Sequence, residues 1–392
     1  MKIGKLLGIV CVIAMVAGLL VAGCAGEAPP TEGPPTEGPP TEGPPEEEVY
    51  NLTMCVQHPA VDTMVSQVLA GWYNWLDEES NGRIKFETIV SAGCAAPPDI
   101  YDAARGGLVD IGCQSYGENP GAFPLQEVAN LPILFPWPNA RTASMVTSAL
   151  YEKYPEMQAE HPDVKVINFH STSASFPSFT KKDVRTLEDY QGLVVEEFGA
   201  YGVDATEALG GTPARMPILE AYDALAKGTL DGIDANWTAL FIFSWVDSLN
   251  YCIQVPTIVN CFIHVMNLNT YNSLPPDLQA LFDESYWVLP ELFGYQFDKE
   301  EALNRAAYED ILVSRGLPGI YIPSDEELAR WEEAVQPVYE NWVQQAAAIV
   351  GEAKARAILE DAKMFAEEYR YETTPFDWCE ETLHDWGAPA YQ

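Results

Sequence analysis

The sequence predicts an α/β protein built from two α/β units and followed by long helices. Three observations carry this prediction. Short apolar strands alternate with amphipathic helices between residues 51 and 113, which is the order of a parallel sheet. The alternation starts again after Lys181, and a nearly continuous helical pattern runs from Pro275 to Arg315.

The first unit follows from a β-α-β-α-β order that continues into a further helix and strand. The predicted strands are 51–57, 83–90, 108–113 and 164–169, and the predicted helices are 59–82, 98–105 and 139–161. The first of these helices has an apolar face at helical spacing and stops at Asn81–Gly82, where glycine permits a turn.

The second unit repeats this alternation. Its predicted strands are 192–196 and 229–234, and its predicted helices are 200–209 and 217–226. The second helix has Pro217 in its first turn and Gly228 just past its end, which is the usual asymmetry of helix termini. The β-rich residues 262–268 are predicted to return to the first unit. Two more helices are expected at 325–347 and from Gly351 to Tyr369. An aromatic tail follows them, and the sequence predicts no function for it.

The N-terminus has the pattern of an export signal. Lys2 and Lys5 precede an apolar run, residues 6–20, that is too short to span a membrane confidently. The run ends in Val-Ala-Gly before Cys24 and resembles a bacterial lipoprotein signal, which implies that Cys24 is lipidated and anchors the chain to a bilayer. The alternative is an ordinary secretory signal with an incidental cysteine. Residues 25–48 repeat Thr-Glu-Gly-Pro-Pro and predict a disordered tether.

The charge and the cysteines restrict the class of protein. The formal net charge of −37 disfavours binding to nucleic acid and to anionic lipid head groups. Six cysteines follow Cys24, and none lies in a Cys-x-x-Cys unit or beside a clustered histidine pair. An exported domain permits disulfides, so buried free thiols, one or two bridges, and a metal site all stay open. The Gly-x-Ser-x-Gly, His-Glu-x-x-His and phosphate-loop motifs are absent, so no enzyme is predicted.

Several runs together resemble the solute-binding proteins of TRAP transporters, the DctP-like family. The first-unit runs are NGRIKFETIVSAG, DIYDAARGGLVDIG and NLPILF, and the second-unit runs are TLEDYQGLVV and ALGGTPARMPILEAYDALAKGTLDG. The later runs YNSLPPDLQALFDESY and DEELARWEEAVQPVYENWV resemble the closing helices, so the likeness covers about residues 50–345. The resemblance implies a two-lobed, periplasmic-binding-protein-like fold that closes over a small solute and delivers it to a permease of small and large membrane subunits.

This resemblance divides the chain into predicted parts. They are a lipoprotein signal (1–23), the lipidated cysteine and tether (24–48), a first lobe (49–170 with 262–320), a second lobe (171–261) and C-terminal helices and tail packing on the lobes (321–392). The expected location is outside the cytoplasm, lipid-anchored in the periplasm or on the outer face of the cell membrane. The alternatives are a receptor of the same fold for another transporter or a sensor, a lipoprotein enzyme, or a structural surface lipoprotein.

The chain departs from the family at the residue that usually binds a substrate carboxylate. Most members place an arginine at the end of the strand that here reads Gly-Leu-Val-Val-Glu, so Glu196 takes its position. Glu196 could bind a cationic or polar solute, hold a cation such as calcium or sodium that bridges to a carboxylate, or turn away from the cleft. Arg215 is the substitute carboxylate partner, or else a surface arginine balancing local acids. No other cofactor is predicted.

The remaining candidate ligand-binding residues follow predicted strands or lie at the lobe crossing. Ligands of open α/β sheets bind at the carboxyl ends of parallel strands. The candidates are Gln57, His58 and Tyr116 in the first lobe, Ser173 and Phe176 at the crossing, and Asn236 and Trp237 in the second lobe. For each of them a packing or surface function is the alternative. The predicted function is therefore reception of a small organic solute, with an organic acid as the expected class.

Overall fold

The computed structural model describes residues 48–90, 93–371 and 376–389. The predicted signal, Cys24 and the tether lie outside the described residues. No helix among the described residues is long and apolar enough to cross a membrane.

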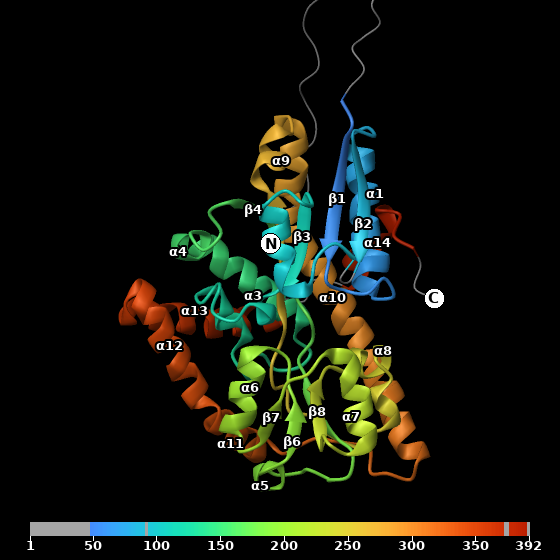
Figure 1. The fold of residues 1–392 in the computed structure, drawn as a ribbon, viewed down its shortest axis with the longest axis vertical. Coiled ribbons are helices and arrows are strands. Elements are labelled where there is room, and N and C mark those ends of the chain that lie inside the picture. The colour runs from blue at the N-terminus through green and yellow to red at the C-terminus, as the bar shows by residue number, and fades with distance from the viewer. Residues whose placement is uncertain (1–47, 91–92, 372–375, 390–392) are drawn as a thin grey trace, which may run out of the picture. The chain divides into compact units, whose positions relative to one another are not determined.

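The first lobe is built on a five-stranded sheet of order β2-β1-β3-β10-β4. Its strands are β1 (Tyr50–Val56), β2 (Ile84–Val90), β3 (Ile111–Ser115), β4 (Val164–Ser171) and β10 (Cys261–Asn267). β1 pairs in parallel with β2 and β3, while β10 pairs antiparallel with β3 and β4. The predicted return of residues 262–268 to the first unit is confirmed (Figure 1).

The helices of the first lobe differ from their predictions mainly at their ends. They are η1 (Met64–Leu69), α1 (Ala70–Glu79), η3 (Pro97–Asp99), α2 (Ile100–Arg105), η4 (Tyr116–Glu118), η5 (Gln126–Asn130), α3 (Ala140–Lys153), α4 (Pro155–Gln158) and α9 (Leu268–Ser273). The helix predicted from Pro59 begins only at Met64, because Asp62 accepts a hydrogen bond from the Met64 amide at 2.9 Å. The helix predicted over 139–161 breaks at Pro155, which lacks an amide hydrogen.

The second lobe is built on a six-stranded sheet of order β11-β9-β5-β8-β6-β7. Its strands are β5 (Phe176–Phe179), β6 (Val194–Glu196), β7 (Thr212–Ala214), β8 (Gly232–Ala235), β9 (Tyr251–Ile253) and β11 (Ile320–Tyr321). Its helices are α5 (Leu187–Tyr190), α6 (Gly199–Ala208), η6 (Ile218–Glu220), α7 (Ala221–Lys227), α8 (Trp237–Ile242) and η7 (Trp245–Asp247). The sequence did not predict β5, β7, β9 and β11, which are short.

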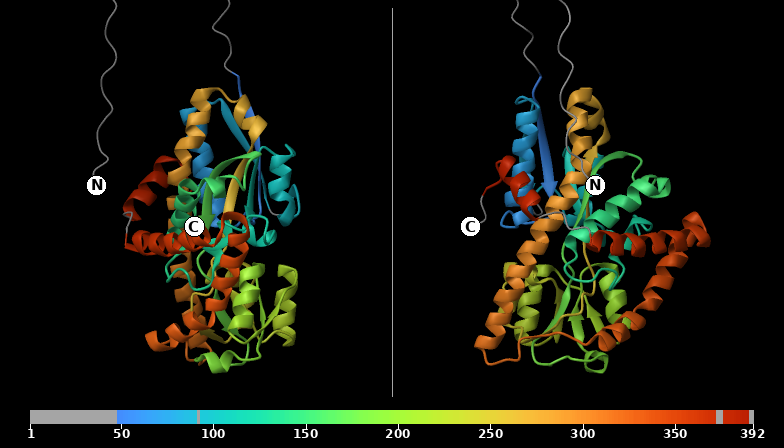
Figure 2. Two further views of the ribbon diagram at one scale, coloured as in Figure 1. Left: turned by 90° about the vertical axis from the view of Figure 1, so that its left-hand side faces the viewer. Right: turned by 180° about the vertical axis from the view of Figure 1, so that it is seen from behind.

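Two antiparallel segments and one helix connect the lobes. Residues 171–175 and 257–260 run side by side, and the Ser175 amide donates to the Ile258 carbonyl at 2.7 Å. Helix α10 (Pro276–Ser314) passes from the first lobe to the second, as Figures 1 and 2 show in orange. The boundary predicted for the first lobe at residue 320 therefore needs correction. The second half of α10 packs on α8, and β11 pairs with β9 in the second sheet.

Two carboxylates of α10 cap helices of different lobes. Asp298 accepts hydrogen bonds from the Asn139, Ala140 and Arg141 amides at 2.9–3.1 Å, at the N-terminus of α3. Glu301 accepts from the Trp237 and Thr238 amides at 2.6 and 3.0 Å, at the N-terminus of α8. These amides have no partner inside their own helix, so the carboxylates satisfy them and tie both lobes to one helix.

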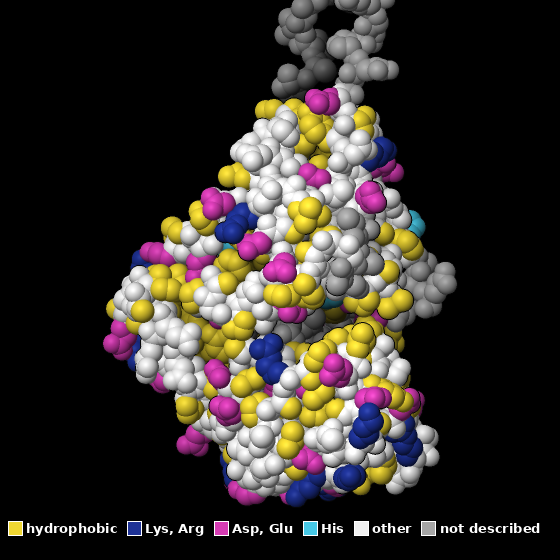
Figure 3. Space-filling model, in the orientation of Figure 1, with side chains coloured by type: hydrophobic (Ala, Val, Ile, Leu, Met, Phe, Trp, Pro, Cys, Tyr) yellow, Lys and Arg dark blue, Asp and Glu magenta, His cyan; other side chains and the backbone are white. Residues whose placement is uncertain are grey.

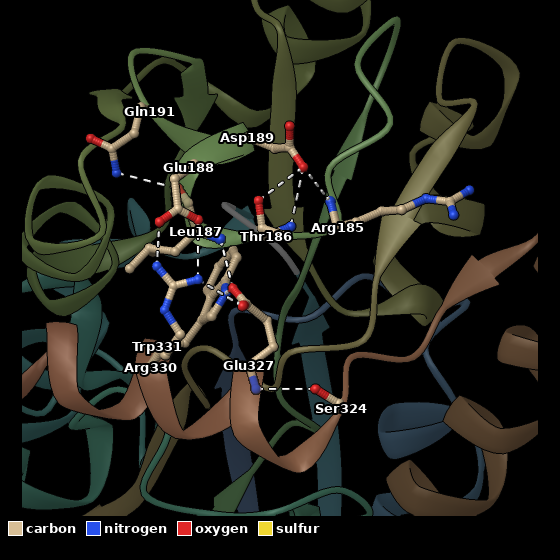
Figure 4. Close-up of polar contacts among 10 residues, drawn as sticks. All are labelled: Arg185, Thr186, Leu187, Glu188, Asp189, Gln191, Ser324, Glu327, Arg330 and Trp331. Atoms are coloured by element: carbon tan, nitrogen blue, oxygen red, sulfur yellow. Dashed lines mark hydrogen bonds and ion pairs between the residues drawn. The ribbon is translucent and has the colours of Figure 1, made fainter.

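The C-terminal helices run from the second lobe back to the first. They are α11 (Asp325–Ala334), α12 (Gln336–Val350), α13 (Glu352–Tyr371) and α14 (Phe376–Asp385). Figure 4 shows α11 on α5, where Glu327 accepts from the Leu187 amide at 2.7 Å and Arg330 pairs with Glu188. α13 packs on α3, and α14 packs on α10. The helix predicted over 325–347 is interrupted at Val335.

The described cysteines show which of the open alternatives holds. Cys55 and Cys94 form a disulfide with a Cα–Cα distance of 6.2 Å. The other four described cysteines, Cys113, Cys252, Cys261 and Cys379, are buried and free.

Candidate functional site

The candidate site lies where the two lobes meet. Figure 3 shows a hollow at this level, with hydrophobic side chains and a basic side chain at its edge. A small crevice opens there between the turn at Tyr116, the start of α6 at Phe198–Tyr201 and the connecting segment 258–260. The carboxyl ends of β1, β3 and β6 lie near this boundary, as expected for a ligand site in an α/β protein.

The first-lobe side of the boundary holds a hydrogen-bonded polar group. The Gln57 amide nitrogen donates to Glu118 at 2.5 Å, and the Ser115 backbone amide donates to the Gln57 side-chain oxygen at 2.9 Å. Burial raises the pKa of Glu118, although the bond from Gln57 and the charge of Arg215 oppose this rise. The predicted residue Gln57 therefore orients an acid that the sequence did not single out.

The second-lobe side of the boundary contains Glu196, which is fully buried at the end of β6. One carboxyl oxygen accepts from the Met216 amide at 3.1 Å, and the other has no hydrogen-bond partner among the described residues. Burial raises the pKa of Glu196 to about 7, while the Met216 bond and Arg215 act against it. A carboxyl in this state can donate a proton, bind a cation or pair with a solute.

The charge of Arg215 acts on an acid in each lobe. Its side chain is exposed, and within the described part of the chain it forms no ion pair. Its charge nevertheless lowers the pKa values of both Glu118 in the first lobe and Glu196 in the second. Arg215 is therefore a cation whose charge acts on both acids, and it is available to a negatively charged group.

Tyr116 is the predicted first-lobe residue that lines the crevice. Its ring is buried against Phe123 and Phe169, and its hydroxyl has no hydrogen-bond partner in the described part of the chain. A buried hydroxyl normally has a partner, so this group is a candidate to bind a polar ligand atom.

Three other predicted residues lie in the interior near the lobe connection. His58 is buried and bonds Asp62 through Nδ1 at 2.8 Å. The Ser173 hydroxyl donates to Asp298 at 3.3 Å, and Phe176 stacks on Trp237 with ring centroids 4.0 Å apart. These contacts give all three a structural function, and their contact with solute stays a prediction.

Asn236 and Trp237 form the start of α8. The Asn236 side chain accepts from the Ala239 amide at 2.8 Å and so caps this helix. Trp237 is fully buried, and Arg305 of α10 lies 5.6 Å from its ring centroid. Both residues therefore have the packing function that was the alternative to solute binding. Their contact with solute stays a prediction.

A buried acid pair behind Glu196 was not predicted. Glu197 accepts from the Thr206 hydroxyl, and Asp234 accepts from the Thr257 hydroxyl at 2.5 Å. Burial and the neighbouring Asp234 raise the pKa of Glu197 well above its usual range. The consecutive glutamates at the end of a buried strand were the only sequence signal for this pair.

Comparison with known proteins identifies the family. Residues 56–345 match the model of bacterial extracellular solute-binding protein, family 7. The chain belongs to this family. Its members are solute receptors, so the prediction of a receptor and not an enzyme is confirmed.

Solved structures of similar fold come from several bacteria. A TRAP periplasmic solute-binding protein from Desulfovibrio salexigens is 24% identical, with a TM-score of 0.74 over 85% of this chain and 100% of that one. A second, from Bordetella bronchiseptica with bound (R)- and (S)-mandelate, is 23% identical with a TM-score of 0.70, over 82% and 99%. A third, from Rhodoferax ferrireducens with copurified benzoate, is 22% identical with a TM-score of 0.73, also over 82% and 99%. They confirm the predicted two-lobed fold.

One curated relative also matches. An uncharacterised protein of Haemophilus influenzae is 19% identical over 216 residues, which is 54% of this chain. The match spans 63% of the length of that relative.

Proposed function

We propose that this chain is the extracytoplasmic receptor of a TRAP-type transporter and binds a small organic acid between its lobes. The family match over residues 56–345 carries the proposal, because the family consists of extracellular solute receptors. Closure of the lobes buries the solute, and a permease of small and large membrane subunits recognises the closed form. The solute shifts the equilibrium from the open to the closed form only by as much as it binds the closed form more tightly.

The ligands bound by proteins of the same fold support a carboxylate as the group recognised. Proteins of this fold contain mandelate, benzoate or glucuronate, all of which are carboxylates. Glu196 stands where most members have the carboxylate-binding arginine, so Arg215 is the group proposed to bind the solute carboxylate. The guanidinium offers two parallel charge-assisted hydrogen bonds to such a group.

A cation bridge is the second candidate for the same solute. The free oxygen of Glu196 is an oxygen ligand of the kind that calcium and sodium prefer. A cation there would neutralise the buried acid and attract a carboxylate, so Glu196 would act through the ion.

A thermal melt distinguishes these two forms of the proposal. The purified protein is heated with mono- and dicarboxylates, amino acids, amines and sugars, each with calcium and with EDTA. A ligand at 100 times its Kd adds about 2.7 kcal/mol of stability, which raises Tm by several degrees. A carboxylate shift that survives EDTA and disappears in Arg215→Ala supports the arginine. A shift that needs calcium and disappears in Glu196→Gln supports the bridge.

A matched arginine variant controls for the loss of surface charge. Arg185 is also exposed on the second lobe, where it pairs with Asp183. Arg185→Ala should keep the full carboxylate shift. If amines or neutral solutes shift Tm and carboxylates do not, the proposed solute class is wrong.

We also propose that Cys24 is lipidated and anchors the receptor to the membrane. The small residues before Cys24 and the tether that follows support this proposal. Cys24→Ala should move the protein from the membrane fraction to the soluble extracytoplasmic fraction. Equal retention of the variant on membranes would contradict the anchor.

A further inference from the structure

A row of metal-ligating side chains lies on one face of the first sheet, beneath α10. His58 follows β1, Cys113 is on β3, His264 is on β10 and His170 is on β4. His264 pairs with Cys113 across the sheet, and His170 pairs with Phe262, two residues before His264. Since alternate residues of a strand share a face, Cys113, His170 and His264 point to the same side. Phe293 and Phe297 of α10 pack on His170 from above.

Three of these side chains are close enough to share one ion. A ring nitrogen of His58, a ring nitrogen of His170 and the Cys113 sulfur all lie within 4.8 Å of one another. His170 and Cys113 are fully buried, and His58 is 7% exposed. Small rotations about the side-chain bonds bring such atoms to the spacing of metal ligands.

The polar atoms of this row have no partner in the described part of the chain. They are Nε2 of His58 and both ring nitrogens of His170 and of His264. Buried polar atoms are almost always hydrogen-bonded, and leaving them unpaired is costly. Five such atoms in one layer indicate that something binds there.

Asp62 prepares His58 to act as a ligand. One Asp62 oxygen bonds His58 Nδ1 at 2.8 Å, and the other accepts from the Met64 amide at 2.9 Å. Nδ1 therefore carries the hydrogen that is donated to Asp62, and the lone pair lies on the partnerless Nε2. Metal-binding histidines characteristically donate their second ring nitrogen to a carboxylate in this way.

We propose that His58, Cys113 and His170 bind a zinc ion that ties β1, β3 and β4 together under α10. Mixed imidazole and thiolate ligands favour zinc over calcium or magnesium. His264, whose ring centroid is 4.9 Å from that of His170, offers a further imidazole in the same row. None of the three ligands lines the crevice at the lobe boundary, and the function of the ion is to stabilise the first lobe next to Gln57.

Cobalt binding tests the site. The intact protein is stripped with a chelator and titrated with Co²⁺, whose tetrahedral thiolate complexes absorb in the visible and near ultraviolet. We expect one equivalent to produce a sulfur-to-cobalt charge-transfer band, and zinc to displace it and raise Tm. Cys113→Ser should abolish the band, and Asp62→Asn should weaken binding by about 10–100-fold.

Two controls separate this site from other thiols and from misfolding. Cys261 is also a buried free cysteine of the first sheet, so Cys261→Ser should keep the band. X-ray absorption of the zinc-loaded wild type should show one sulfur and at least two nitrogen ligands, and it needs no variant. A folded wild type that takes up no metal, a band that persists in Cys113→Ser, or a zinc ion without sulfur would each overturn the proposal.

Discussion

Helix α10 and the end of β6 both carry buried carboxyl groups, but these groups have different hydrogen-bond partners. Asp298 and Glu301 accept hydrogen bonds from backbone amides at two helix N-termini, so their oxygens are occupied. Glu196 accepts from one amide, and its second oxygen has no partner among the described residues. The comparison teaches that burial of an acid does not by itself indicate function. An unpaired oxygen beside a cation and a second acid does.

The largest expected effect is the loss of the hydrogen bonds by which Asp298 holds the N-terminus of α3. Asp298→Ala leaves three amides of α3 without their acceptor, and each buried unsatisfied group costs about 1–3 kcal/mol. We expect the free energy of unfolding to fall by about 3 kcal/mol or more in a urea titration. Asp310→Ala, at an exposed position of the same helix, should be nearly neutral. Equal losses of unfolding free energy in both variants would contradict this function of Asp298.

The next effect tests the close approach that lets Asp298 reach α3. A Cβ added at Gly294 would collide with the Arg141 backbone, which cannot move aside without displacing α3. Gly294→Ala should therefore cost about 1–3 kcal/mol by overpacking. Leu303→Ala, at a half-exposed position of α10, is the control. A Gly294→Ala variant as stable as wild type would mean that the two helices are not in this contact.

The pH dependence of stability distinguishes the two kinds of carboxyl from surface acids. Burial raises the pKa values of Glu196 and Glu301 to about 7, from a usual value of 4.5. Their contribution to stability is complete below the unfolded value and is lost as pH rises through about 7. Tm should therefore fall as pH rises from about 4.5 to about 7, and Glu196→Gln should flatten part of that slope. A slope that is unchanged in this variant would show that Glu196 does not titrate there.

The smallest effect on stability is expected at Arg215. Its side chain is exposed, so Arg215→Ala should change the free energy of unfolding by no more than about 0.5 kcal/mol. A charge-assisted hydrogen bond is worth about 1.5–3 kcal/mol, so carboxylate affinity should fall by roughly tenfold or more. Calorimetry on the variant and on Arg185→Ala measures this difference. Unchanged affinity would remove Arg215 from the site.

The sequence predicted some parts of the site better than others. Gln57 and Glu196 end predicted strands, so strand ends brought them to the boundary between the lobes. Arg215 was predicted on the loop before a helix, from the resemblance to the family. The sequence did not predict Glu118 as a site residue, because its place beside Gln57 depends on a hydrogen bond between their side chains. Asn236 and Trp237 were predicted as ligand-binding residues of the second lobe, but in the structure Asn236 caps α8 and Trp237 is buried at its start.

The sequence by itself determined the two alternating α/β units, the long helix from Pro276 and the family, because these depend on local periodicity and on the order of motifs. Only the tertiary structure decided the Cys55–Cys94 disulfide, the division of α10 between the lobes and the row of histidines beneath it. His58, Cys113 and His170 are far apart in the chain, and no local pattern connects them. Strand pairing and register bring Cys113 and His170 to one face of the sheet, and the chain after β1 adds His58 there.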